Sequence, residues 1–280
     1  MKSGFKRLNV SLLAISLSAF LGASLSAKAQ IVTLVDGNST AQVNTSSQQG
    51  MFNWYVDGVN QLYQQWFWYG IGSGTGQNSI DTISAPTIST PNAGSLYVNY
   101  ANATLSAQVN YVLTGGTLGS GTSQLNESIH LVNLSNGSLT LRFYQYSDFD
   151  LMGSPGGDSL QLARNLSGKF YEAIQTKNGM TMSETDITGG GTPPGANHGE
   201  ASIYPNLLNR LNGGTQILLA DNTAQVGPGD TAWAFEWDIT LAAGASLDIS
   251  KNKQISGVPE PGVISLLGLG FLALVWRKRR

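Results

Sequence analysis

Apolar and polar residues alternate with a period of two along most of the segment from residue 30 to residue 257, which is typical of β-strands. One face of a single expected strand carries Leu105, Ala107, Val109, Tyr111 and Leu113. Helical periodicity is scarce, and one short helix is expected over residues 205–211. Many strands without intervening helices favour an all-β fold, and we expect a single antiparallel β-sandwich or jelly-roll-like domain.

Turn pairs that contain glycine separate the alternating stretches. They are Asp57-Gly58, Asn136-Gly137 and Asn178-Gly179. Asn-Gly between alternating strands is a strong hairpin signal, so these pairs are predicted to join neighbouring strands. A last pair of strands is expected over residues 231–241 and 246–249. The pattern predicts roughly nine or ten strands around one sizeable core.

The charges are distributed unevenly along the chain. The 15 Lys and Arg nearly balance the 17 Asp and Glu, but eight of the basic residues lie in the first 28 or the last four positions. Residues 30–258 hold seven basic and 16 acidic side chains, a net charge of about −9. An acidic domain repels phosphate backbones, which argues against nucleic-acid binding. Because the chain has no cysteine, disulfides, thiolate metal sites and a cysteine nucleophile are excluded.

The first 29 residues have the pattern of a secretory signal peptide. Three basic side chains within the first seven residues precede an apolar stretch over residues 12–25, and Ala27 and Ala29 then form an A-x-A site. We expect export through the Sec translocon and cleavage after Ala29. The alternative is an uncleaved anchor, although the apolar stretch is shorter than the about 20 residues that a spanning helix needs.

The last 23 residues consist of three parts. Pro259, Glu260 and Pro261 come first, and the two prolines keep this segment extended because proline opposes helix formation. Residues 263–276 are apolar and are predicted to form a transmembrane helix, which is short for a bilayer core of about 30 Å and therefore suits transient insertion. Four basic residues end the chain and are expected to stay cytoplasmic.

This tail resembles the PEP-CTERM sorting domain of exported bacterial proteins. The resemblance covers residues 258–280 only, and Pro259-Glu260-Pro261 stands where that family has its motif. It implies recognition by an exosortase, removal of the tail, and delivery to the cell surface or to an exopolysaccharide matrix. An ordinary C-terminal anchor is the alternative. The chain is thus divided into a signal peptide (1–29), a passenger domain (30–257) and a sorting tail (258–280).

The passenger contains no nucleophile elbow, phosphate-binding loop or dinucleotide fingerprint, so we expect no enzymatic activity and no catalytic residues. Its low charge and high content of Gly, Asn, Ser and Thr suit a structural or adhesive module of an extracellular matrix. A polysaccharide hydrolase stays open as the third interpretation, because glutamates distant in sequence could converge in space. They are Glu127, Glu172, Glu184, Glu200 and Glu236.

An aromatic stretch around Trp66 and Trp68 offers the second interpretation. On a strand the two indoles point the same way about 6.6 Å apart. If they are exposed, they could stack on sugar rings and make the passenger a carbohydrate-binding module for exopolysaccharide. If they are buried, they belong to the core, where large aromatic residues are most often found.

The segment that begins at Asp148 and Asp150 starts like a calcium-binding loop, with oxygen ligands at positions 1 and 3. Met152 breaks that pattern at position 5, so a solvated turn is the preferred interpretation and a looser calcium site the alternative. The two histidines, His130 and His198, are far apart and lack thiolate partners, which predicts no zinc site. No other cofactor is expected.

Overall fold

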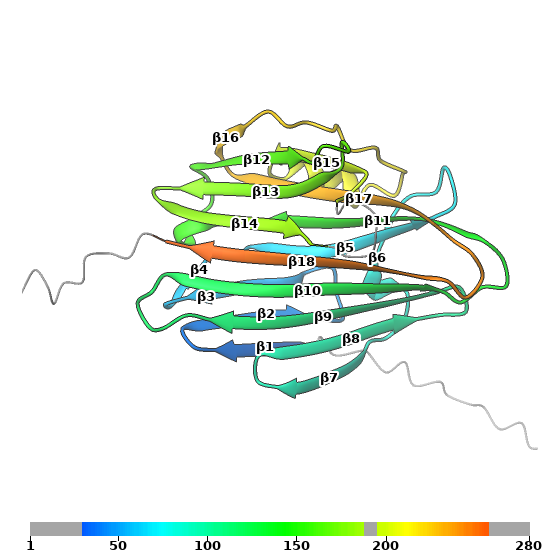
Figure 1. Cartoon of the computed structure of the whole chain (residues 1–280), viewed down its shortest axis with the longest axis horizontal. Coiled ribbons are helices and arrows are strands. Elements are labelled where there is room, and N and C mark those ends of the chain that lie inside the picture. The colour runs from blue at the N-terminus through cyan, green and yellow to red at the C-terminus, as the bar shows by residue number, and fades with distance from the viewer. Residues whose placement is uncertain (1–29, 188–194, 258–280) are drawn as a thin grey trace, which may run out of the picture.

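The computed structural model describes residues 30–187 and 195–257, which form two nine-stranded β-sheets packed face to face (Figure 1). Sheet A has the order β1 (Ile31–Asp36), β2 (Ser39–Asn44), β3 (Gly50–Val56), β5 (Gln64–Ile71), β11 (Leu139–Asp148), β17 (Thr231–Leu241) and β15 (His198–Ile203), with β4 (Val59–Asn60) beside β3 and β6 (Asn78–Ser79) beside β5. Sheet B has the order β16 (Val226–Gly229), β12 (Asp158–Arg164), β13 (Phe170–Lys177), β14 (Met180–Asp186), β18 (Ser246–Ser256), β10 (Thr122–Asn133), β9 (Leu105–Gly115), β8 (Ser95–Ala101) and β7 (Thr87–Asn92). The predicted all-β sandwich is confirmed, although it has more strands than the sequence predicted.

Helices contribute little to the described part of the chain. They are η1 (Ile80–Thr82), η2 (Leu151–Gly153) and α1 (Asn206–Leu211), the last of which is the short helix that the sequence predicted. None of the helices in the described ranges is long and apolar enough to cross a membrane. The predicted signal peptide and the predicted transmembrane segment lie outside the described residues.

Two of the three turn pairs form hairpins. Asn178-Gly179 joins β13 to β14, with Lys177 opposite Met180. Asp57-Gly58 joins β3 to β4. The prediction for Asn136-Gly137 was wrong, because β10 lies in sheet B and β11 lies in sheet A. The last predicted pair is divided in the same way, with β17 in sheet A and β18 in sheet B.

A single buried amide explains why these two connections cross between the sheets. The side-chain Nδ2 of Asn133 donates hydrogen bonds to the carbonyl oxygens of Gly137 (2.7 Å), Leu241 (3.0 Å) and Ala242 (2.9 Å). Gly137 belongs to the first connection, and Leu241 and Ala242 belong to the second. Asn133 therefore satisfies backbone acceptors of both corners at once, which a local turn signal cannot reveal.

The interior between the sheets contains charge as well as aromatic rings. Glu127, Glu184, Lys251 and Lys253, here called the lysine–glutamate quartet, have completely buried side chains. Lys251 Nζ lies 2.7 Å from Glu127 Oε2, and Lys253 Nζ lies 2.6 Å from the same oxygen. Lys251 Nζ also lies 4.9 Å from the centre of the Phe67 ring. Two cations and two anions thus neutralise one another inside the sandwich.

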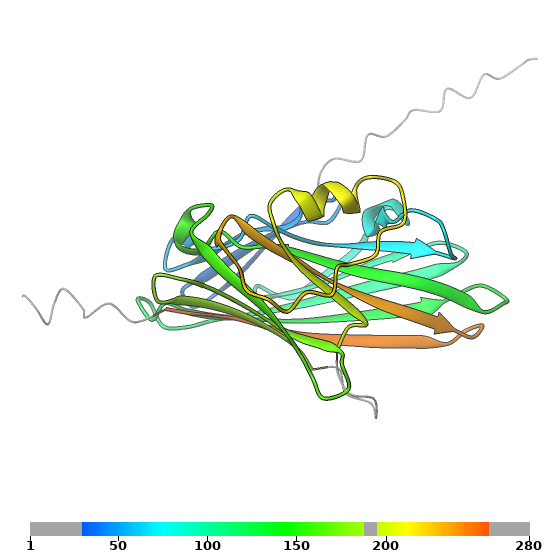
Figure 2. The ribbon, with the colours of Figure 1, turned by 90° about the horizontal axis from the view of Figure 1, so that it is seen from above.

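The outer face of sheet A is covered by α1 and the segment that follows it (Figure 2). Trp68 Nε1 donates to Asn212 Oδ1 at 3.1 Å, and Trp66 Nε1 donates to Ser79 Oγ at 2.8 Å. Trp66 is 0% exposed and Trp68 is 1% exposed. The hypothesis that these indoles stack on sugars is therefore wrong, because β5 is buried on both faces and neither ring reaches solvent.

Candidate functional site

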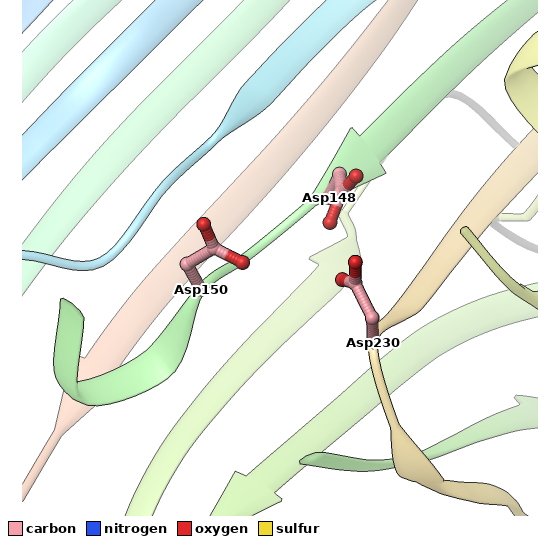
Figure 3. A group of neighbouring side chains, drawn as sticks. All are labelled: Asp148, Asp150 and Asp230. Carbon is pink, nitrogen blue, oxygen red and sulfur yellow. The ribbon is translucent and has the colours of Figure 1, made fainter. Parts of the chain in front are cut away.

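Three aspartates meet at one end of sheet A. Asp148 is the last residue of β11, Asp150 follows it by two residues, and Asp230 lies between β16 and β17. The strand register sets Asp148 opposite Ala232, which brings Asp230 close. One carboxylate oxygen from each aspartate lies within 4.8 Å of the other two. Figure 3 shows the three side chains, here called the acidic cluster, turned toward one another.

Backbone hydrogen bonds place two tyrosines beside the acidic cluster. The N–H of Tyr63 donates to the carbonyl oxygen of Asp148 at 3.0 Å, and the N–H of Tyr204 donates to that of Asp230 at 2.8 Å. The two rings meet edge to face, with centroids 5.6 Å apart. Since these bonds join main chain to main chain, they fix the backbone of each tyrosine next to the backbone of an aspartate.

The tyrosines and the acidic cluster line a pocket of about 220 Å³, to which Pro155 also contributes. Tyr63, which is 49% exposed, also lines a second pocket of about 350 Å³. The polar side chains of this second pocket are Ser47, Gln48, Gln49, Gln64 and Asn212. One exposed aromatic ring therefore borders both an acidic pocket and an amide-lined pocket.

One carboxylate oxygen of Asp148 accepts no hydrogen bond from any residue in the described ranges. The residue is 1% exposed, and its Oδ2 accepts a hydrogen bond from the Tyr146 hydroxyl at 3.0 Å. Its Oδ1 is buried and has no hydrogen-bond partner. Burial and the nearby charge of Asp230 raise the pKa of Asp148 to about 8. A buried carboxylate without compensation is costly, so this group favours a proton or another cation.

Negative charge exceeds positive charge around the acidic cluster. Burial and the charge of Asp230 raise the pKa of Asp150, and burial raises the pKa of Asp230. Burial also raises the pKa of neighbouring Asp158 to about 6, against the opposing charge of Lys177. Lys177 Nζ lies 3.7 Å from Asp158 Oδ1 and donates to the carbonyl oxygen of Ser154 at 2.6 Å. One lysine thus faces four carboxyl groups.

A second polar group lies on the covered face of sheet A. His198 on β15 is paired directly with Glu236 on β17. The Nδ1 of His198 lies 2.9 Å from Asp221 and its Nε2 lies 3.3 Å from Asp238. Burial lowers the pKa of His198, but the hydrogen bond to Asp221 and the charges of Asp221, Glu236 and Asp238 raise it above its usual value. Burial raises the pKa of Glu236 to about 7.

The structure brings some of the predicted site residues together and separates others. Asp148 and Asp150 lie close together, as the calcium alternative required, and Asp230 joins them although no pattern in the sequence predicted it. Glu127 and Glu184 also converge, but they lie in the interior with two lysines and have no opening to solvent. The sorting residues Pro259, Glu260 and Pro261 and the cleavage residues Ala27 and Ala29 lie outside the described residues.

Comparison with known proteins identifies the tail and the fold. Residues 257–280 match the PEP-CTERM protein-sorting motif, which marks exported proteins directed to the cell surface and implies processing by an exosortase. No curated protein matches the sequence. A putative aldose 1-epimerase from Escherichia coli K12 is similar in structure, with a TM-score of 0.53 at 10% identity over 82% of this chain and 99% of that one.

Two further solved structures share the architecture. A GalM/aldose epimerase homologue from C. elegans has a TM-score of 0.52 at 8% identity, over 82% of this chain and 99% of that one. A bacterial glucoamylase in complex with acarbose has a TM-score of 0.55 at 6% identity over 82% of this chain, which spans only 34% of the glucoamylase. At these identities the likeness establishes a common fold.

The comparisons correct the expected function of the passenger. A non-enzymatic structural or adhesive sandwich was predicted because the sequence contains no catalytic motif. The same fold occurs in proteins described as an aldose 1-epimerase and a glucoamylase, which are enzymes that act on sugars. The reasoning failed because the absence of a contiguous motif does not exclude enzymatic activity in this fold, where side chains from strands far apart in sequence can form a site.

Proposed function

We propose that the exported domain binds a saccharide of the extracellular matrix in the pocket formed by Tyr63, Tyr204 and the acidic cluster. The observation that carries the proposal is the pairing of two tyrosine rings with three carboxylates around one pocket of about 220 Å³. Sugar hydroxyls donate hydrogen bonds to carboxylates, and the apolar faces of sugar rings pack on aromatic rings. Sugar-active proteins that share this fold add support.

The second pocket gives the proposed site room for more than one sugar unit. Its volume of about 350 Å³ falls in the range of about 300–1,000 Å³ that is typical of ligand pockets. The side-chain amides of Gln48, Gln49 and Asn212 offer both donors and acceptors to hydroxyl groups. A saccharide chain bound across Tyr63 would place one sugar unit next to the carboxylates of the first pocket and the next sugar unit next to the amides of the second pocket.

The test is a pull-down with exopolysaccharide from the producing cells, comparing Tyr63→Ala with Tyr97→Ala. Tyr97 on β8 is 38% exposed and lines neither pocket, so it is the matched control. Loss of the stacked ring is expected to weaken binding roughly tenfold, since about 1.4 kcal/mol corresponds to a factor of ten. Equal binding by both variants would rule out this pocket as the sugar site.

Acid–base chemistry on a sugar is the second candidate function, and Glu236 is the observation that favours it. Its pKa of about 7 and its place opposite His198 give a carboxyl group and an imidazole that exchange protons near neutral pH. If this function is present, His198→Asn lowers the rate at which anomers of a free aldose interconvert, followed by polarimetry, to the rate without protein, whereas His130→Asn leaves the accelerated rate unchanged.

For sorting, we propose cleavage after Ala29, transient insertion through residues 263–276, and recognition of Glu260 by an exosortase before the domain reaches the matrix. Glu260→Ala is expected to accumulate in the membrane fraction with its tail intact. The measurement is the ratio of processed to membrane-retained protein in cells that contain the exosortase. Normal processing of the variant contradicts a role for Glu260.

A further inference from the structure

The acidic cluster is an arrangement of oxygen atoms without enough positive charge around it. Its three carboxylates come from two chain segments about 80 residues apart, and Lys177 is bound to Asp158 and Ser154 beside them. Like charges held this close repel one another, so the arrangement needs compensation. The lysine–glutamate quartet shows that the same fold does place lysines between buried carboxylates elsewhere.

From this geometry we propose that Asp148, Asp150 and Asp230 bind a calcium ion. Ca²⁺ lies about 2.3–2.6 Å from its oxygen ligands, so two oxygens on one ion are at most about 5 Å apart. The three carboxylate oxygens lie within 4.8 Å of one another and satisfy this limit. Mg²⁺ binds at about 2.0–2.1 Å in a stricter octahedron and is expected to fit less well.

Asp148 supplies the independent indication of a ligand. Its side chain is 1% exposed, its Oδ2 is bound by Tyr146, and its Oδ1 is buried without a hydrogen-bond partner. Figure 3 shows this carboxylate directed at the space between Asp150 and Asp230. A bound cation would give this oxygen a partner. A solvated acidic turn does not explain why a buried carboxylate oxygen has none.

Backbone hydrogen bonds hold the segments that carry the three aspartates in place before any ion arrives. Asp148 and Asp230 each accept a main-chain hydrogen bond from a pocket tyrosine, and the carbonyl oxygen of Asp150 accepts one from the N–H of Gly153 at 3.0 Å. Three carboxylates provide three of the six to eight oxygens that Ca²⁺ takes. The pocket of about 220 Å³ leaves the remaining positions to water or to hydroxyl groups.

Calcium binding goes beyond the proposed saccharide binding and is measured without any sugar. The purified protein is stripped with chelator and titrated with CaCl2 by calorimetry. One site is expected, with a Kd on the order of 0.1–1 mM, the range of extracellular calcium modules. Because no sugar is present, failure of the saccharide proposal leaves this result unaffected.

The variants Asp150→Asn and Asp230→Asn remove single ligands from partly exposed positions, which keeps the risk to folding small. Each is expected to weaken calcium binding at least tenfold, whereas the control Asp238→Asn, which alters a carboxylate outside the acidic cluster, binds as the unchanged protein does. MgCl2 is expected to bind at least tenfold more weakly than CaCl2. Absence of calcium binding, normal binding by both variants, or equal binding of Mg²⁺ overturns the proposal.

Discussion

The lysine–glutamate quartet and the acidic cluster solve the problem of buried charge in different ways. In the quartet, Lys251 and Lys253 lie within 2.7 Å of one oxygen of Glu127, and all the side chains are completely buried. In the acidic cluster, three carboxylates come together, and Lys177 only partly opposes the raised pKa values of Asp150 and Asp230. A balanced group inside a core is closed to ligands, whereas an unbalanced group at a pocket has the charge to attract one.

Position in the sandwich accounts for this difference. The quartet is built from β10, β14 and β18, and its side chains point into the space between the sheets. The acidic cluster lies where β11 ends and β17 begins, at a pocket that opens to solvent. Unbalanced charge in the interior would destabilise the fold, because no ion can reach it. At a pocket, a bound ion or ligand can neutralise the same charge.

The largest effect is expected from breaking the quartet with Lys251→Met. Removing one partner leaves an uncompensated carboxylate in the core, which costs about 3–5 kcal/mol. Urea denaturation measures the loss. The double variant Lys251→Met with Glu127→Leu removes a pair together and is expected to recover much of the stability. If the single variant is as stable as the unchanged protein, Lys251 does not neutralise the buried glutamates.

A smaller effect of opposite sign is expected from Asp148→Asn in the presence of chelator. The pKa of Asp148 is about 8 in the folded protein and about 4 when unfolded, so the folded state holds its proton more tightly. Stability therefore falls as pH rises from about 4 to 8, and the neutral amide escapes this loss. The variant is expected to be more stable than the unchanged protein from pH 6 upward, by roughly 2–3 kcal/mol at pH 6, and equal to it near pH 4.

The Tm measured from pH 4 to pH 9 tests this sign. Asp36→Asn, which alters an exposed aspartate outside the acidic cluster, serves as the control. A variant that is less stable than the unchanged protein at pH 8 would mean that the carboxylate of Asp148 is already compensated, which contradicts the contrast between the two regions.

The smallest effect is expected at the exposed pair of His130 and Asp248. These residues lie on β10 and β18, three positions away from Glu127 and Lys251 on the same two strands. Their side chains are 40% and 68% exposed and 2.7 Å apart. Exposed ion pairs contribute little, so His130→Ala is expected to change stability by at most about 0.5 kcal/mol. If His130→Ala lowered the free energy of unfolding as much as Lys251→Met does, burial would not determine how much an ion pair contributes to stability.

Sequence reasoning recovered the elements that depend on local chemistry. The alternation of Leu105 to Leu113 identified β9, and Asn178-Gly179 identified a hairpin. It failed where long-range contacts decide the outcome. Asn133 links the two connections between the sheets by hydrogen bonds. Trp66 is covered by Ser79 and Tyr100, and Trp68 by Asn212 at the end of α1, which the alternation pattern does not reveal.

The acidic cluster could be predicted from the sequence only in part. Asp148 and Asp150 are neighbours in sequence and gave a local signal. Asp230 follows β16 and lies 80 residues after Asp150, and the pairing of β11 with β17 brings it to the other two aspartates. Sequence spacing holds no information about which strands pair, so the third ligand required the structure.

The most direct test of the central claim is a crystal structure of the protein grown in the presence of CaCl2, with the anomalous signal of the ion measured. A single strong peak is expected between Asp148, Asp150 and Asp230, about 2.3–2.6 Å from an oxygen of each. A pocket that contains only water, with the three carboxylates turned away from one another, would contradict it.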